Sequence, residues 1–94
     1  MRVRWLRTAL ANLEAEAQYI ARDSPAAAGR AVATIARSVE RLAEYPASGR
    51  PGRVAGTREL VVPGTPYIIP YRVRGGAVEV LRVFHGARRW PPKL

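Results

Sequence analysis

The residues of this chain that could do chemistry are concentrated in its second half, and most of them are arginines. They lie on or just after stretches rich in β-forming residues: Arg58, Arg72, Arg74, Arg82, Arg88 and Arg89. On alternating positions of neighbouring strands, several such side chains would share the exposed face of one sheet. The pattern predicts a concave basic surface suited to nucleic acid, ribosome or an acidic protein segment.

A ribonuclease built on this surface would need a base for the ribose 2′-hydroxyl, cations for the phosphorane and an acid for the leaving oxygen. Glu59 and His85 are the candidates for acid and base, with Tyr67 and Tyr71 as weaker ones. His85 is the single histidine and precedes Gly86 at an expected strand end, where imidazole would be exposed and suited to proton transfer. The alternative is a solvated basic face with ordinary strand residues, which the residues alone favour.

Trp90 lies between Arg88-Arg89 and Pro91-Pro92. Its ring could stack on a base, anchor in a groove of a partner, or hold the carboxy-terminal segment against its own domain. The sequence leaves these alternatives open.

No metal or cofactor site is expected. With one histidine, no cysteine and scattered carboxylates, the chain offers no ligand cluster at useful spacing. Gly49-Arg50-Pro51-Gly52 is not followed by a helix, as a phosphate-binding loop would require.

Composition predicts one basic domain over residues 1–94. The net charge is +9, and the second half carries most of it, since residues 48–94 hold nine Lys/Arg against two acids. Almost all of the basic residues are arginines, which either bind phosphate and carboxylate bidentately or reflect the base composition of a genome. No apolar run approaches the roughly 20 residues that span a bilayer, and no secretion signal is visible, so a cytoplasmic protein without membrane contact is expected.

Two amphipathic helices are expected in the first half, after a short strand over residues 2–6. The first covers residues 9–21, with Thr8 as its cap. Ser24 and Pro25 are typical of the start of the second helix, and Pro46 ends it after Tyr45. The apolar positions form two stripes, which predict an antiparallel hairpin covering a sheet: Leu10, Leu13, Ala17 and Ile20, then Ala28, Val32, Ile35, Val39 and Leu42.

The second half predicts a loop and three strands. The loop covers residues 46–56, and the strands cover roughly residues 57–62, 67–73 and 77–84. Turns are expected at residues 63–66 and, as a tight hairpin, at Gly75-Gly76. Pro70 inside the second strand indicates an edge strand or a local bulge. The class is therefore α+β, with a helical hairpin on one face of an antiparallel sheet.

Four segments, in this order, resemble the RelE/ParE superfamily of small bacterial toxins over nearly the whole chain. They are the Gly49-Arg50 turn, the Arg-Glu-Leu strand from Arg58, the Tyr-Ile-Ile-x-Tyr strand from Tyr67, and the strand exit Leu-Arg-Val-Phe-His-Gly-Ala-Arg from Leu81. The resemblance implies an N-terminal β-strand and an antiparallel helical hairpin packed on one face of a small antiparallel β-sheet.

One departure distinguishes the branches. Nuclease members of the RelE branch carry an arginine directly after the residue that opens the middle strand, and here that position is Ile68. The resemblance is therefore closer to the ParE branch, whose members poison DNA gyrase and have no accepted catalytic residues to transfer.

The resemblance implies a ParE-like toxin of a type II toxin-antitoxin system, a class tied to growth arrest and plasmid stabilization. It would inhibit DNA gyrase and be neutralised by a cognate antitoxin. The residues expected to bind the target are Arg82, His85, Arg88, Arg89 and Trp90. One alternative is a ribosome-dependent endoribonuclease of mRNA that uses Arg58, Glu59, Arg82 and His85. Another is a basic nucleic-acid-binding module without enzymatic action.

Overall fold

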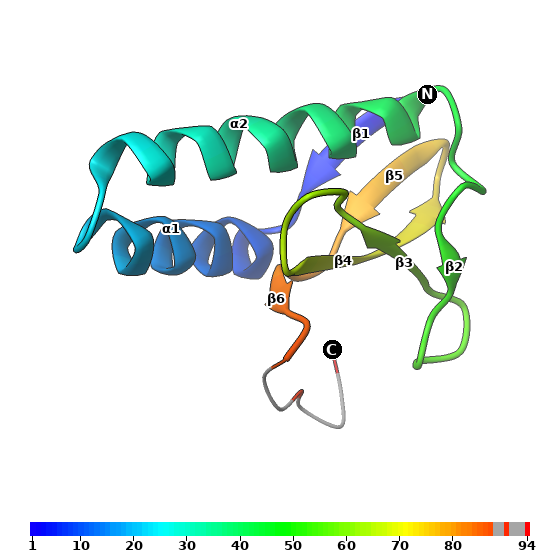
Figure 1. Ribbon diagram of the computed structural model, residues 1–94. Coiled ribbons are helices and arrows are strands. Elements are labelled where there is room, and N and C mark those ends of the chain that lie inside the picture. The colour runs from blue at the N-terminus through cyan, green and yellow to red at the C-terminus, as the bar shows by residue number, and fades with distance from the viewer. Residues whose placement is uncertain (88–89, 91–93) are drawn as a thin grey trace.

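The computed structural model describes residues 1–87, 90 and 94, which form a helical hairpin and one sheet (Figure 1). The elements, in chain order, are β1 (Arg2–Trp5), α1 (Arg7–Ala21), α2 (Pro25–Glu40), the 3-10 turn η1 (Arg41–Ala43), β2 (Arg50–Pro51), β3 (Arg58–Val61), β4 (Tyr67–Arg74), β5 (Ala77–Val80) and β6 (Phe84–His85). Within the described ranges, no helix is long and apolar enough to cross a membrane.

The first helix begins two residues earlier than predicted. Its N-cap is Leu6, which makes no side-chain hydrogen bond, so the prediction that Thr8 caps this helix is wrong. Ala9 is fully buried, whereas Leu10, which was expected in the apolar stripe, is 50% exposed. Leu13 packs partly buried against the core, as its spacing predicted.

The second helix starts as the sequence predicts. The Ser24 hydroxyl accepts a hydrogen bond from the backbone N–H of Ala27 at 3.1 Å, and Pro25 occupies the first helical turn. Because so few residues separate the two helices, α2 folds back beside α1 as an antiparallel hairpin (Figure 1).

The end of this helix differs from the prediction. The regular helix stops at Glu40 rather than Tyr45, and η1 continues it as a tighter turn. Leu42 within η1 is 1% exposed and packs with Tyr71 and Val78 of the sheet. The change of winding therefore keeps the last residue of the predicted stripe in the core.

Residues of the apolar stripes differ in how deeply they are buried. Ile35 and Val39 are buried in the main core, and Ile20 is partly buried against it. Ala17 and Val32 are only half-buried and line the furrow between the two helices. Both helices thus contribute to the main core, Ala9, Leu13 and Ile20 from α1 and Ile35 and Val39 from α2.

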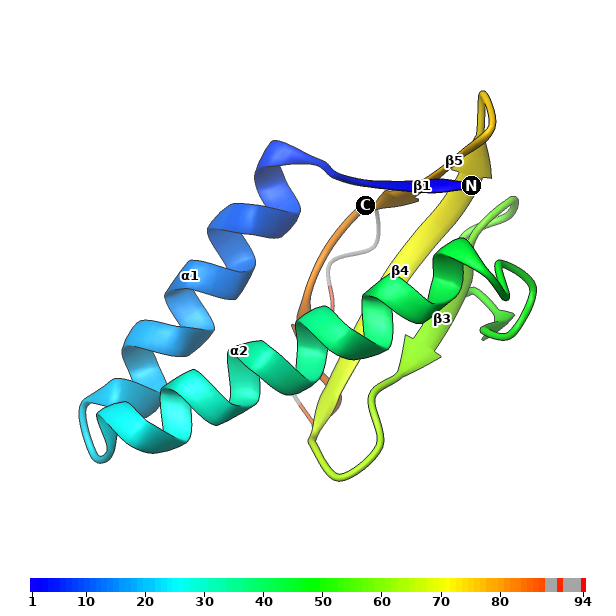
Figure 2. The same cartoon turned by 90° about the horizontal axis from the view of Figure 1, so that it is seen from above.

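The sheet has the strand order β1-β5-β4-β3-β2, and β6 pairs with the start of β4. β1 runs parallel to β5, and the other pairs are antiparallel. Both helices lie on the same side of this sheet (Figure 2). The predicted α+β fold is confirmed, and the parallel β1–β5 pair makes the small sheet mixed. The segment predicted as a loop over residues 46–56 contains the short strand β2, which pairs with β3.

The last predicted strand, residues 77–84, is two strands in the structure. Val80 of β5 lies opposite Tyr71, and Phe84 of β6 lies opposite Ile68. Between these two pairs, three residues of one chain segment (81–83) face two residues of β4 (69–70). The extra residue is a β-bulge, which ends β5 and starts β6.

The bulge lies beside Pro70. β4 is a central strand, so of the two alternatives for this proline the bulge is confirmed and the edge strand is wrong. The carbonyl of Pro70 accepts a hydrogen bond from the N–H of Leu81 at 2.9 Å. Because proline has no N–H to return, the facing chain departs from regular pairing at this point.

Both predicted turns are confirmed. Gly75 and Gly76 have φ values of 57° and 72°, the left-handed conformation that a two-residue type I′ hairpin needs at both central positions. Gly64, in the turn between β3 and β4, has a φ of 75°.

The burial pattern predicts a contrast in stability between two leucines. Leu42→Ala should lower the free energy of unfolding by about 2–5 kcal/mol, because it leaves a cavity at a buried site. Leu10→Ala, at a half-exposed site, should cost about 0.5 kcal/mol or less. Urea unfolding measures both values. Equal losses for the two variants would contradict the packing of η1 against the sheet.

Candidate functional site

The sheet presents one face to the helices and one face away from them. On β4, Tyr67, Ile69 and Tyr71 are buried in the core, so the alternate residues face the other way. Directly paired residues of neighbouring strands share a face. The surface away from the helices, called the open face below, therefore carries Arg2, Arg4, Arg50, Glu59, Arg72, Arg74, Ala77 and Glu79.

Arg58 does not join this surface. It lies opposite Tyr71 on the helix side, so it is not among the several arginines that share the exposed face. Its guanidinium donates hydrogen bonds to the carbonyls of Ala47 and Gly49, at 3.3 and 2.8 Å. Arg58 therefore holds the chain segment that follows the helices against the sheet.

The Tyr71 hydroxyl fixes the same segment. It accepts a hydrogen bond from the N–H of Gly49 at 2.9 Å and donates one to the carbonyl of Pro46 at 2.7 Å. A Cβ atom at Gly49 would stand 2.5 Å from that hydroxyl oxygen. The Gly49-Arg50 motif thus needs glycine because the tyrosine approaches its backbone so closely.

Glu79 is buried on the open face and paired with arginines. Its Oε1 lies 2.7 Å from Nε of Arg72, and its Oε2 lies 3.4 Å from Nη2 of Arg4. The hydrogen bond from Arg72, followed by the charges of Arg72, Arg4 and Arg74, lowers the pKa of the Glu79 carboxyl, and burial opposes this only in part. Glu79 is therefore held as a carboxylate that compensates arginine charge.

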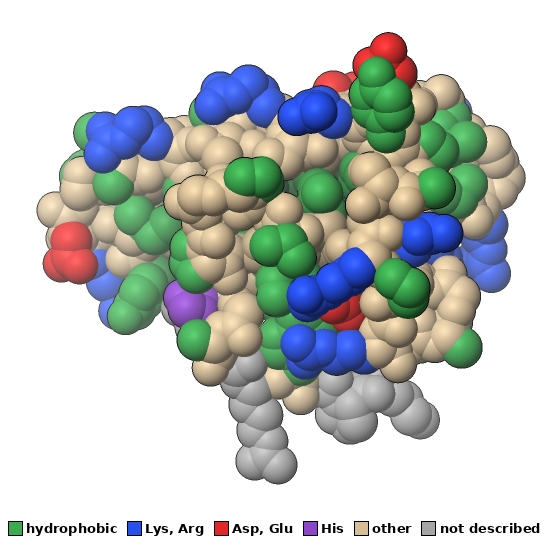
Figure 3. Space-filling model, turned by 45° about the vertical axis from the view of Figure 1, so that its right-hand side comes forward, with side chains coloured by type: hydrophobic (Ala, Val, Ile, Leu, Met, Phe, Trp, Pro, Cys, Tyr) green, Lys and Arg blue, Asp and Glu red, His purple; other side chains and the backbone are tan. Residues whose placement is uncertain are grey.

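Glu59 is bound in the same way at the other end of the open face. Its Oε1 accepts hydrogen bonds from Nε and Nη2 of Arg50, at 3.2 and 3.0 Å. Its Oε2 accepts the backbone N–H of Arg53 at 3.0 Å and lies 3.7 Å from the Nε of that arginine. In Figure 3, which turns the β2 side forward, a small acidic patch is visible between basic side chains. Both oxygens of Glu59 are occupied.

The structure does not bring Glu59 and His85 together. His85 lies opposite Tyr67, on the helix side of β4, whereas Glu59 lies opposite Pro70, on the open face. The proposed acid and base of a ribonuclease therefore lie on opposite faces of the sheet.

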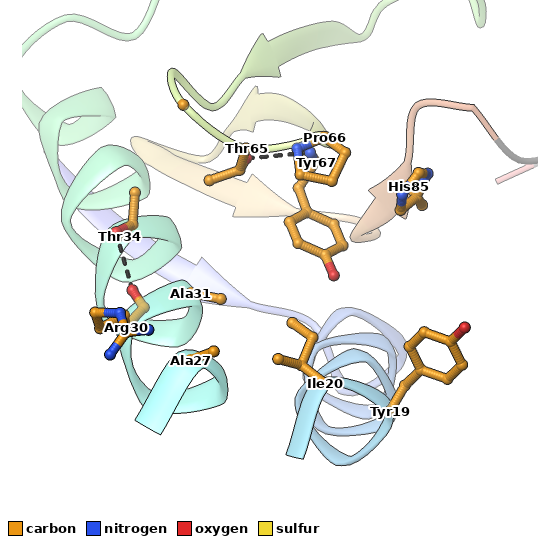
Figure 4. Close-up of a pocket in the computed structure, with 11 residues that line it drawn as sticks. Tyr19, Ile20, Ala27, Arg30, Ala31, Thr34, Thr65, Pro66, Tyr67 and His85 are labelled. Carbon is orange, nitrogen blue, oxygen red and sulfur yellow. Dashed lines mark hydrogen bonds between the residues drawn. The ribbon is translucent and has the colours of Figure 1, made fainter. Parts of the chain in front are cut away.

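His85 instead lines an open groove of about 790 Å³ between the helical hairpin and the start of β4 (Figure 4). Its ring meets that of Tyr67 edge to face, with centroids 5.8 Å apart. Its Nδ1 accepts the N–H of Ala87 at 3.2 Å, which leaves Nε2 to carry the proton of the neutral ring. The Tyr67 hydroxyl donates to Glu16 of α1 at 3.3 Å. The groove thus combines an apolar floor with polar groups from both layers.

Trp90 contacts residues of its own chain. The centroids of the Trp90 and Phe84 rings are 4.6 Å apart, and the guanidinium carbon of Arg53 lies 3.6 Å from the centroid of the Trp90 ring. This geometry fits the interpretation in which the tryptophan holds its segment against the domain. Within the described residues, its buried Nε1–H has no hydrogen-bond acceptor.

Of the remaining predicted target-binding residues, the structure describes Arg82. Nη2 of Arg82 donates to the carbonyl oxygen of Leu94 at 2.9 Å. Arg88 and Arg89 lie outside the described residues. Across residues 1–87, 90 and 94, no group of three or more acidic or histidine side chains is arranged to hold a metal ion.

Sequence reasoning missed the Arg72–Glu79 pair. The signal was present, because these residues stand at equal distances from the Gly75-Gly76 turn and so must face each other across the hairpin. The Arg50–Glu59 pair had no such signal, since β2 was not predicted.

Comparisons with known proteins agree on one family. The family model described as the ParE toxin of type II toxin-antitoxin system, parDE, matches residues 3–90. The protein Y4kP of Sinorhizobium fredii, named as a candidate toxin, is 53% identical over 93 residues, which cover 99% of this chain and 96% of that protein. Toxin RelE2 of Caulobacter vibrioides is 44% identical over 84 residues, which cover 89% and 93%. A solved chain of the chromosomal ParDE TA system from P. aeruginosa matches with a TM-score of 0.81 and 33% identity, over 90% of this chain and 95% of that chain.

The lowered pKa of Glu79 predicts a specific loss of stability in acid. A carboxyl whose pKa is lowered from 4.5 by folding stabilises the protein above that pH, and the contribution is lost as pH falls through the folded value. Glu79→Gln should therefore be less stable than the wild type at neutral pH and should lose less stability on acidification. Glu44→Gln, at an exposed carboxyl, should follow the wild type. Urea midpoints between pH 7 and pH 3 test this, and parallel curves for wild type and Glu79→Gln would refute it.

Proposed function

This chain belongs to the ParE toxin family of type II toxin-antitoxin systems, and on that premise we propose that it inhibits DNA gyrase until a cognate antitoxin binds it. A toxin of this class is paired with a protein antitoxin. Because gyrase acts on the chromosome, the proposal also places the protein in the cytoplasm.

The family match supports the toxin class, and residue 68 supports the choice of target. Nuclease members of the RelE branch carry a cation there, but Ile68 is half-buried opposite Phe84. Removing one donor that stabilises a transition state costs roughly a hundredfold to a thousandfold in rate. Glu59, fully engaged by Arg50 and Arg53, offers no free base to compensate. A gyrase inhibitor needs only a binding surface.

Cleavage of mRNA on the ribosome is the second candidate, because a relative that is 44% identical is named toxin RelE2. Arg58, Glu59, Arg82 and His85 would be its residues. Their separation across the two faces of the sheet makes this candidate the weaker one.

We assign target binding to the carboxy-terminal part of the chain: Arg82, His85, Arg88, Arg89 and Trp90. Aromatic and arginine side chains dominate the energy of many interfaces. Trp90 supports this assignment because it is only half-buried where it packs against Phe84 and Arg53.

Removal of residues 88–94 should abolish toxicity and gyrase inhibition while antitoxin binding is largely kept. His85→Ala should leave toxicity nearly unchanged, because a gyrase inhibitor needs no acid or base and we expect the arginines and Trp90 to supply most of the binding energy. The double variant Arg88→Gln/Arg89→Gln leaves Trp90 and its contact residues Phe84 and Arg53 unsubstituted and therefore tests the two charges. Growth after brief induction and supercoiling by purified gyrase are the measurements. Cleavage of ribosome-bound message that is lost in His85→Ala would instead establish the ribonuclease.

Association with the antitoxin should slow as salt rises, because we expect acidic and apolar partner residues to cover part of the arginine-bearing sheet and the hairpin. The net charge of +9 supplies the long-range attraction. Stopped-flow mixing at low and high ionic strength measures the rate, and the dissociation rate serves as the internal control. An association rate independent of salt would exclude the electrostatic part of this proposal.

A further inference from the structure

The open face carries a compact group of arginines where β1, β5 and β4 lie side by side. Residue pairing places them in two rows across these strands, and we call them the arginine cluster: Arg2, Arg4, Arg72 and Arg74. Ala77 lies in the middle of the first row and Glu79 in the middle of the second. The two helices lie on the other side of the sheet and do not cover this face (Figure 2).

Among the residues that the structure describes, the charge of the cluster is only partly neutralised. Glu79 is the one acid in the two rows, so four arginines and one glutamate leave three positive charges. Arg4 and Arg72 bind Glu79. Arg2 and Arg74 are exposed and make no ion pair with any described residue.

Arg2 and Arg74 lie on either side of Ala77 in the first row. Two strand spacings separate them, or about 10 Å. Ala77 between them has a short side chain and is 1% exposed. Because both arginines are exposed, their guanidinium groups are accessible to anions in solution.

The chemistry of the cluster fits a polyanion better than an acidic peptide. Peptide binding takes most of its energy from apolar or aromatic anchors in pockets. The principal grooves of the described residues lie elsewhere, and their linings include none of the four arginines. Phosphate backbones need only positive charge, and they bind by releasing counterions.

The same surface favours a duplex over a single strand. Proteins that bind single strands stack the bases on aromatic rings beside the basic groups. The two rows of the cluster contain arginine, alanine and glutamate and no aromatic residue. A DNA duplex, in contrast, can be bound without sequence preference through contacts to its phosphates alone.

We propose that the arginine cluster binds the phosphate backbone of duplex DNA without reading its sequence. Direct contact with DNA goes beyond gyrase inhibition, and it would hold the toxin on the substrate of its target. The two activities fail separately, because DNA binding is measured without gyrase.

The test is fluorescence anisotropy of a labelled duplex, titrated with the full-length toxin at several salt concentrations from about 50 mM upward. Arg2→Gln/Arg74→Gln removes two charges and leaves the Arg72–Glu79 pair in place. Arg30→Gln/Arg37→Gln removes the same charge from exposed positions on α2 and is the matched control. Urea unfolding checks that both variants fold.

We expect the cluster variant to bind about tenfold more weakly near 50 mM salt, with a slope of log K against log salt shallower by about two. The control variant should keep the slope of the wild type. Equal weakening of both variants would mean that diffuse net charge binds the DNA, and would overturn the assignment. Absence of binding by the wild type, or tighter binding of single-stranded or double-stranded RNA than of the DNA duplex, would overturn it too.

Discussion

The buried hydroxyl of Tyr71 is the constraint on which the rest of this structure depends. A phenol with no solvent contact must find both an acceptor and a donor inside the protein, or the fold loses about 1–3 kcal/mol. The backbone of Pro46 and Gly49 supplies both. The chain leaving the helices is thereby held against β4, and the next strand, β2, pairs antiparallel with β3. One side chain thus connects the helical layer, the connecting segment and the middle of the sheet.

The arginines of the sheet fall into two groups, those that pair with buried carboxylates and those without such a pair among the described residues. Arg50 and Arg72 hold the carboxylates of Glu59 and Glu79, which are nearly inaccessible to water and would be costly to bury unpaired. Arg2 and Arg74 have no such partner among the described residues and remain available to other molecules. Arg58 and Glu59, the proposed ribonuclease residues, also have structural roles. Arg58 holds the segment at Gly49, and Glu59 is bound by Arg50 and Arg53. The number of arginines alone therefore does not show which of them are available to bind another molecule. The ion pairs between strands show it, because they identify the arginines that are already engaged.

Features set by neighbouring residues were predictable from the sequence. Ser24 and Pro25 start a helix wherever they occur together before an apolar stripe, and Gly75-Gly76 closes a hairpin through its own conformational freedom. The bulge was anticipated as one of two alternatives, because Pro70 lacks an N–H, but its position opposite the end of β5 depends on long-range pairing. For the same reason the face on which Glu59 and His85 lie could not be read from spacing within one strand. Those faces follow from register, which the whole sheet determines together.

The parallel pairing of β1 with β5 has a consequence for the order in which the protein matures. Residues 2–5 are synthesised well before residues 77–80, with which they form hydrogen bonds. The helical hairpin can form during translation from local contacts, whereas the sheet that it covers can close only after residues 77–80 have been synthesised. Until then Val3 and Trp5 have no core to join. A nascent chain therefore lacks its finished surface until that strand has emerged, and an antitoxin already in the cell can be present when the surface forms.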